Sequence, residues 1–190
     1  TESEAVVDGV KTHFERVIKN QTCYYGNAPD LPVIPDKFEG YNKLYSMIDQ
    51  PSVTGDEGMK KTNRVQLIFD NDVKTKWCVR PTAEDGSVTV TWAMSEKVRI
   101  DAYALSTAND WPDRNPDAWC IYGKNSEEEE WTLIHKATKA GLPKELFTYS
   151  DVFKVEDPKE YKHYKMTLTE NFNNRDLYQF SELVLLQNKD

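Results

Sequence analysis

Cysteine is scarce in this sequence of 190 residues. The three that occur, Cys23, Cys78 and Cys120, are too far apart for a CxxC zinc knuckle or a dithiol redox site. So few cysteines also exclude a scaffold held together by several disulfides. Either one bridge forms and leaves a free thiol, or all three side chains are buried as small apolar groups, and the sequence leaves both open.

Long apolar runs and an excess of positive charge are also missing. The run Leu183–Leu186 is far shorter than the roughly 20 apolar residues that a membrane-spanning helix needs. Lys and Arg number 24 against 32 Asp and Glu, which gives a net charge of -8. We therefore expect no membrane span and no nucleic-acid or anionic-lipid partner, because such partners require clustered positive charge.

Recognisable catalytic motifs are missing as well. The sequence contains no HExxH, GxSxG, GxxxxGK[ST] or GxGxxG pattern. Its histidines, His13, His135 and His163, do not have the spacing of metal ligands. With 32 carboxylates, no pair stands out for acid–base catalysis. The sequence does not predict an enzyme.

The first third of the chain differs from the rest in its residue pattern and in its proline and glycine content. Residues 3–19 carry apolar side chains at helical spacing, with charged residues on the other face, which predicts an amphipathic helix. Residues 23–63 are rich in proline and glycine and predict an irregular strap. We therefore expect a segment 1–63, made of helix and strap packed on a second unit, and a β-domain over 64–190.

The β pattern begins after residue 64. Val88, Val90 and Trp92 alternate with threonines, as expected of a strand with one buried face. Similar short segments follow around residues 98–104, 119–121, 131–133, 164–168 and 178–186, with polar turns between them. Short strands without intervening helices favour an all-β sandwich or barrel.

The segment 67–77 is the most informative one. Asp70, Asp72 and Thr75 place two carboxylates and a hydroxyl within six positions directly after an apolar stretch. Ca²⁺ takes about six to eight oxygen ligands, many of them backbone carbonyls of such loops. The segment is not an EF-hand, because Lys74 and Pro81 stand where that motif needs an oxygen ligand and a glutamate. On composition alone, a turn in which aspartates bond their own backbone is the better explanation.

Four ordered blocks then carry a resemblance to a known family. They are Phe69–Trp77, Tyr103–Trp119, Tyr122–Asn125 with Trp131–Leu133, and Tyr178–Leu183. Together they resemble the galactose-binding-like β-sandwiches, which include discoidin domains, coagulation factor five/eight type C domains and family 32 carbohydrate-binding modules. The resemblance covers residues 64–187 and leaves 1–63 outside. It implies a jelly-roll β-sandwich of about eight strands.

The resemblance also implies a structural calcium ion. Carried over position by position, its ligands would be the side chains of Asp70, Thr75 and Glu182 and the backbone carbonyls of Leu67, Asp72, Thr75 and Ser181. Asn71 stands where the family has glycine, and asparagine is the next-best residue for a left-handed turn.

Candidate ligand-binding residues lie in two polar loops. Trp77, Trp92, Trp119 and Trp131 occupy alternating strand positions and are predicted core residues, whereas Trp111 lies in a proline-containing turn followed by Arg114. Asn173, Arg175 and Tyr178 form a second polar and aromatic segment. The alternative is that Arg114 braces its loop and Trp111 caps the end of the sandwich.

The resulting expectation is a non-catalytic, calcium-stabilised carbohydrate-binding module of an extracellular or cell-surface protein with neighbouring modules, one of which could be an enzyme. Two other functions stay open. The same loops could bind a protein in an adhesion or spacer module without a sugar ligand. Alternatively, residues 1–63 could complete a catalytic site.

Overall fold

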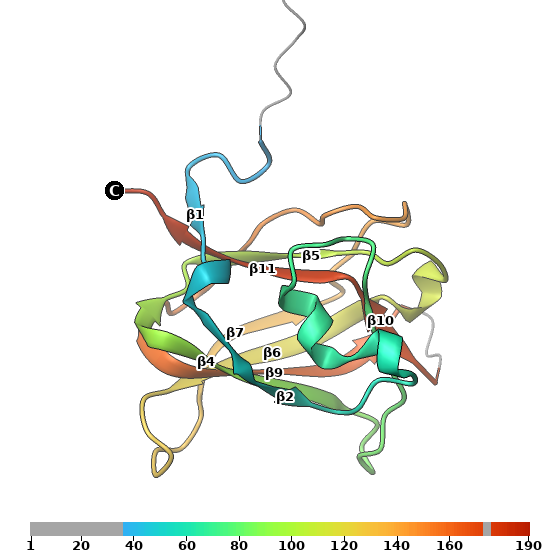
Figure 1. The fold of residues 1–190 in the computed structure, drawn as a ribbon, viewed down its shortest axis with the longest axis horizontal. Coiled ribbons are helices and arrows are strands. Elements are labelled where there is room, and N and C mark those ends of the chain that lie inside the picture. The colour runs from blue at the N-terminus through green and yellow to red at the C-terminus, as the bar shows by residue number, and fades with distance from the viewer. Residues whose placement is uncertain (1–35, 173–175) are drawn as a thin grey trace, which may run out of the picture. The chain divides into compact units, whose positions relative to one another are not determined.

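Two antiparallel sheets dominate residues 36–172 and 176–190, the part of the chain that the computed structural model describes (Figure 1). The five-stranded sheet has the spatial order β2 (Ile48–Gly55), β4 (Val88–Arg99), β9 (Glu160–Asn171), β6 (Pro116–Lys124) and β7 (Thr132–Thr138). The four-stranded sheet has the order β1 (Tyr41–Lys43), β11 (Glu182–Asn188), β5 (Ala102–Ser106) and β8 (Phe153–Lys154). A short ribbon pairs β10 (Tyr178–Phe180) with β3 (Trp77–Val79).

Short 3₁₀ helices interrupt the connections between these strands. They are η2 (Tyr45–Met47), η3 (Lys61–Asn63), η4 (Val65–Phe69) and η5 (Pro112–Arg114). No helix among the described residues is long and apolar enough to cross a membrane.

The main core lies between the two sheets. Side chains alternate between the two faces of a strand, so Val88, Val90 and Trp92 of β4 point into the core. In β9, every second side chain likewise points into the core. The Trp92 and Tyr164 rings stack there with centroids 5.8 Å apart, and Trp77 and Trp119 are fully buried. The prediction of an all-β jelly-roll sandwich is confirmed.

The four-stranded sheet is covered on its outer side as well. A second apolar cluster on that side contains Phe38, with Ala104 of β5 and Val184 of β11. All five residues of β5 are buried. This double burial explains why Leu183–Leu186 is a continuous apolar run rather than an alternating one.

The beginning of the sandwich differs from the expected division at residue 63. Phe38–Asp190 form one compact unit, and part of the expected strap forms strands, because β1 pairs with β11 and β2 with β4. Pro51 is accommodated because β2 is an edge strand, and its register with β4 shifts between Asp49 and Thr54. The predicted helix 3–19 lies outside the described residues.

Two of the cysteines can be placed in the fold. Cys78 is buried in β3 and Cys120 is half-buried in β6, and both are free thiols. Cys23 lies outside the described residues. Within the described ranges, the cysteines therefore act as small packing residues rather than as a bridge.

Candidate functional site

Trp111 projects from the loop between β5 and β6. Its side chain is 54% exposed, although its backbone is fixed in the left-handed region at φ 43° and ψ 69°. The guanidinium carbon of Arg114 lies 5.1 Å from the centre of the Trp111 ring, within the range of a cation–π contact. The loop thus presents an aromatic surface with a planar cationic group stacked on it.

Gln179 and Lys76 hold the backbone of this loop in place. The Gln179 amide nitrogen donates hydrogen bonds to the Asp110 carbonyl at 2.5 Å, to Asp110 Oδ1 at 3.0 Å and to the Trp111 carbonyl at 3.3 Å. Lys76 Nζ forms an ion pair with Asp110 Oδ1 at 2.6 Å. Burial opposes ionisation of Asp110, but the hydrogen bonds from Lys76 and Gln179 hold its pKa below the usual value. These contacts fix the backbone at Trp111 and leave the ring in solvent.

Only part of the second predicted ligand-binding segment lies among the described residues. Asn173 and Arg175 lie outside the described residues. Tyr178 is 4% exposed and pairs with Val79 in the β10–β3 ribbon, so it is a core residue and not an open stacking surface. What remains accessible of Tyr178 contributes to a polar cavity of about 650 Å³ that Arg80 also lines.

The predicted calcium loop follows η4 and is closed by its own oxygens. Thr75 Oγ1 donates to Asp70 Oδ2 at 2.8 Å and to the Asp72 carbonyl at 3.0 Å, and the Asp72 amide donates to Asp70 Oδ1 at 2.9 Å. Asn71 has a φ of 61°, the left-handed conformation expected at this position. The Asp70 amide lies 3.5 Å from the Leu67 carbonyl, so this carbonyl is near the same loop.

Glu182 approaches this loop from the first residue of β11. Its side chain is fully buried, with Oε1 accepting a hydrogen bond from the Asp72 amide at 3.2 Å and Oε2 accepting one from Tyr45 Oη at 2.5 Å. Burial, together with the neighbouring Asp70 carboxylate, raises the pKa of Glu182 to about 8. Ser181 precedes it, and its hydroxyl donates to the Thr107 carbonyl at 2.9 Å. The structure thus brings two carboxylates from distant parts of the chain to one place.

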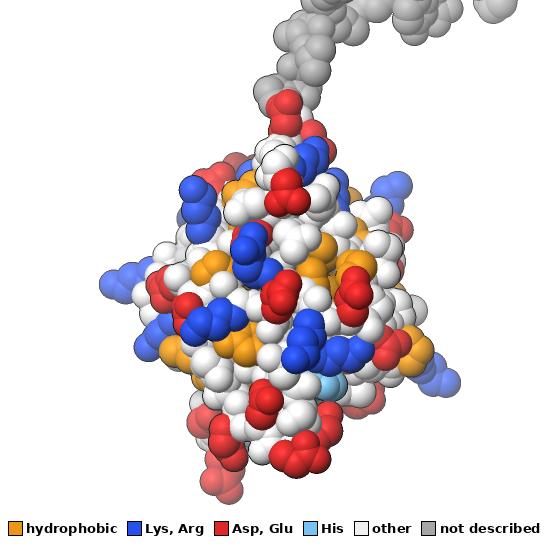
Figure 2. Space-filling view, turned by 90° about the vertical axis from the view of Figure 1, so that its left-hand side faces the viewer, with side chains coloured by type: hydrophobic (Ala, Val, Ile, Leu, Met, Phe, Trp, Pro, Cys, Tyr) orange, Lys and Arg blue, Asp and Glu red, His pale blue; other side chains and the backbone are white. Residues whose placement is uncertain are grey.

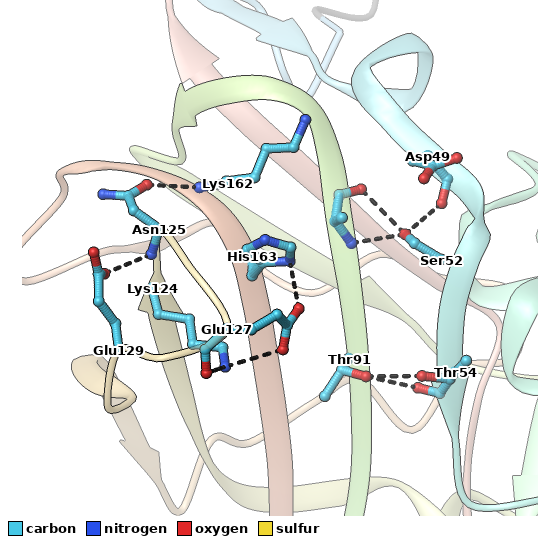
Figure 3. Close-up of polar contacts among 11 residues, drawn as sticks. Asp49, Ser52, Thr54, Thr91, Lys124, Asn125, Glu127, Glu129, Lys162 and His163 are labelled. Atoms are coloured by element: carbon cyan, nitrogen blue, oxygen red, sulfur yellow. Dashed lines mark hydrogen bonds and ion pairs between the residues drawn. The ribbon is translucent and has the colours of Figure 1, made fainter.

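Trp131 lies outside the core in which it was predicted. It directly precedes β7, is half-buried, and lines a cavity of about 610 Å³ on the outer face of the five-stranded sheet. Figure 3 shows the polar residues around this cavity, which come from β2, β4, β9 and the β6–β7 hairpin. The prediction was wrong because a single strand's alternation identifies two faces but not which of them turns inward.

Comparison with known proteins gives matches in structure only. No family model and no curated protein matches the chain. The family 32 carbohydrate-binding module CpGH89CBM32-5 of Clostridium perfringens, solved with GalNAc-β-1,3-galactose, has a TM-score of 0.59 at 11% identity, over 76% of this chain and 99% of that one. The chain has the galactose-binding-like β-sandwich fold.

Two further structures extend the likeness. An F5/8 type C domain from Bacteroides fragilis has a TM-score of 0.62 at 15% identity and covers 80% of this chain and 99% of its own. The CBM32-1 and CBM32-2 domains of Clostridium perfringens ZmpB, solved with GalNAc, have a TM-score of 0.65 at 18% identity, over 82% of this chain and 39% of theirs. The resemblance found in the sequence blocks is thereby confirmed at the level of the galactose-binding-like fold.

The oxygen donors in this galactose-binding-like sandwich suit a hard cation. Within 36–172 and 176–190, no three His, Cys, Asp or Glu side chains gather in a way that could hold a metal. A metal here would therefore bind the Asp70 and Glu182 carboxylates together with hydroxyl and carbonyl oxygens such as those of Thr75 and Asp72. Ca²⁺ accepts this mixture, whereas zinc and copper prefer nitrogen and sulfur.

Proposed function

We propose that this chain is a non-catalytic carbohydrate-binding module of an extracellular protein built from several modules. The observation that carries the proposal is the exposed Trp111 ring on a rigidly braced loop. Modules with the same fold, including one solved with GalNAc-β-1,3-galactose and another solved with GalNAc, bind sugars. Fold alone does not establish function, so the site itself has to provide the argument.

The Trp111 loop offers what a sugar ring requires. The CH groups on one face of a pyranose pack on an aromatic ring, and its hydroxyls need planar donors beside that ring. Arg114 supplies several N–H donors in a fixed plane next to the indole. Because Gln179 and Lys76 already fix the backbone, binding would order little additional chain, which favours affinity.

The proposal includes a structural Ca²⁺ ion. Asp70, Thr75 and Glu182 would bind it through side chains, and Leu67, Asp72, Thr75 and Ser181 through carbonyls. The ion would neutralise the negative charge of the two carboxylates and connect the loop after η4 to β11. The support is the buried Glu182 carboxylate beside Asp70, an arrangement that is costly without a cation.

A second candidate function follows from the same pair of side chains. Tryptophan and arginine are the residues most enriched at energetic hot spots of protein interfaces. The Trp111–Arg114 pair would then contact a protein in an adhesion or spacer module. Binding to a protein partner without binding to any glycan would favour this alternative.

A glycan array, followed by calorimetry on the best neutral oligosaccharide, tests the proposed function. Trp111→Ala should weaken binding at least tenfold, equivalent to about 1.4 kcal/mol, with an unchanged melting temperature. Leu133→Ala is the matched control, because Leu133 is 48% exposed on a different surface, in β7. Full binding by Trp111→Ala, or binding of no glycan by the native protein, would refute the proposal.

A further inference from the structure

The cavity beside Trp131 lies over the outer face of the five-stranded sheet, with Lys165 and Tyr122 beside it rather than in its lining. In one row, Lys165 of β9 lies opposite Tyr122 of β6, and in the next row His163 lies opposite Lys124. The β6–β7 hairpin carries Glu127 to one side of the cavity, and Thr54 of β2 lies on the opposite side (Figure 3). Trp131, from the same hairpin, also lines the cavity. This cavity, lined by Thr54, Thr91, Lys124, Trp131, Lys162 and His163, is called the Trp131 cavity below.

Two ammonium groups share the Trp131 ring. Lys124 Nζ lies 4.8 Å from the ring centre and Lys165 Nζ lies 4.9 Å from it, and Lys165 is also 4.6 Å from the Tyr122 ring. Such contacts hold the cations in place without neutralising them. Burial is the largest cause that lowers the pKa of Lys165, the charge of Lys124 lowers it further, and the Glu130 carboxylate opposes both.

Of the described carboxylates, only that of Glu127 lies within 4.0 Å of one of the three lysines in or beside the cavity, Lys124, Lys162 and Lys165. Lys124 Nζ donates to the Glu127 carbonyl at 3.2 Å and lies 3.5 Å from Glu127 Oε2, on a side chain that is 79% exposed. Lys162 Nζ donates to the Ser95 carbonyl at 2.7 Å. Lys165 contacts the two aromatic rings, and no described carboxylate lies within 4.0 Å of its Nζ.

The protein as a whole has a net charge of -8. The cavity is lined by the carboxylates of Asp49 and Glu127, and His163 Nδ1 lies 4.0 Å from Glu127 Oε1. In Figure 2, on one side of the molecule, basic side chains lie beside a histidine, with a group of acidic side chains below them.

We propose that the Trp131 cavity binds an anionic substituent, a carboxylate or a sulfate, on a saccharide. The anion accepts hydrogen bonds from Lys162, which lines the cavity, and from Lys165 beside it, and neither ammonium group has a described carboxylate within 4.0 Å. The hydroxyls of Thr54 and Thr91, themselves 2.9 Å apart, lie across the cavity and can bond sugar hydroxyls. This inference rests on the proposed carbohydrate binding, but it names a second surface and a charged class of ligand.

The competing explanation is that the lysines only clamp the hairpin against the sheet. In that case Lys165→Met lowers stability and leaves the affinity for anionic sugars unchanged. A binding role predicts the reverse, since methionine keeps most of the aliphatic contact with the rings and removes the charge.

The experiment measures the Kd for a hyaluronan hexasaccharide, which carries carboxylates, and for its fully methyl-esterified form. A sulfated galactan oligosaccharide and inorganic sulfate are separate arms that identify the anion and show whether the sugar is needed. We expect the acid to bind at least tenfold more tightly than the ester, equivalent to about 1.4 kcal/mol. The preference should fall steeply at high salt, because exposed charge pairs are screened.

Lys165→Met and Lys162→Met should each remove about tenfold of the affinity for the acid. Lys136→Met is the matched control, because Lys136 is exposed on β7 and pairs with Cys120 on the same sheet. If Lys165→Met fails to fold, Lys162→Met and the salt dependence of the native protein still decide the question. Equal binding of acid and ester, or unchanged affinity in both lysine variants, would overturn the inference.

The two proposals fail in different ways. If neutral glycans bind and Trp111→Ala abolishes that binding, equal affinity for acid and ester overturns the anionic site alone. Binding of inorganic sulfate but no saccharide overturns both proposals. Loss of acid binding in Lys165→Met but not in Trp111→Ala supports two separate surfaces.

Discussion

Replacing Glu182 by glutamine should change stability in opposite directions with and without calcium. Glutamine has nearly the same shape and can keep hydrogen bonds with Tyr45 Oη and the Asp72 amide. It removes the charge that lies buried beside Asp70. In a chelator this should stabilise the protein, whereas in calcium it removes a ligand and should destabilise it relative to the native chain.

The size of the effect follows from the pKa. Glu182 titrates near 8 in the folded protein instead of 4.5, so the folded state loses stability as pH rises from 4.5 through about 8. At about 1.4 kcal/mol for each pH unit above 4.5, the cost at pH 7 is roughly 3 kcal/mol. Calcium that binds only the folded state, at 1,000 times its Kd, would add about 4.1 kcal/mol to the native protein, which exceeds this cost by about 1 kcal/mol.

Urea denaturation followed by tryptophan fluorescence measures both effects. The free energy of unfolding is determined for the native protein and Glu182→Gln at pH 4.5 and pH 7, each in chelator and in calcium. Glu96→Gln, at an exposed position of β4, is the control for loss of a carboxylate. At pH 4.5 in chelator, the advantage of Glu182→Gln should nearly vanish.

Two results would refute the reasoning. Lower stability of Glu182→Gln than of the native protein in chelator at pH 7 would mean that the buried carboxylate is not strained. Equal stabilisation of both proteins by calcium would mean that Glu182 is not a ligand.

Three further predictions concern single residues. Burial lowers the pKa of His135, so the stability present above the ordinary pKa of about 6.5 is lost as pH falls through the lower folded value; His135→Phe should flatten this loss in melting curves between pH 7.5 and pH 5. Gly123→Ala should cost about 1–3 kcal/mol in urea titrations, because an added Cβ would lie 2.4 Å from the Tyr161 ring, and unchanged stability would show that the ring can move. Asn71→Val should destabilise by about 1–2 kcal/mol at its φ of 61°, whereas Asn71→Gly should be tolerated, and similar melting temperatures for the two would contradict the left-handed turn.

The sequence predicted strands best where apolar and polar residues alternate and the apolar ones are the buried ones. The strands β4 and β9 could be predicted because their inward residues are apolar and their outward residues polar. The approach of Glu182 to Asp70 came from the resemblance, since no local pattern connects such distant positions. The structure supports that part of the metal prediction geometrically, and the ion itself stays a prediction.

Other features depend on tertiary context. The strands β1 and β2 were missed because they are edge strands, one of three residues and the other containing Pro51. Trp131 was assigned to the core because its strand pattern does not reveal which face the neighbouring sheet covers. Tyr178 was predicted both to begin the last strand and to bind ligand, and pairing with β3 buries it.

The pairing of β1 with β11 determines how the sandwich would respond to tension. Tyr41 lies opposite Asn188, so the chain enters and leaves the sandwich at the same end of an antiparallel pair (Figure 1). A pulling force applied at these two residues would load the hydrogen bonds between the strands one after another, beginning at the outermost pair, instead of all together. Such unzipping requires less force than sliding two strands along each other. The first element to detach would be β1, and the mechanical threshold of the module would be set by a strand of three residues.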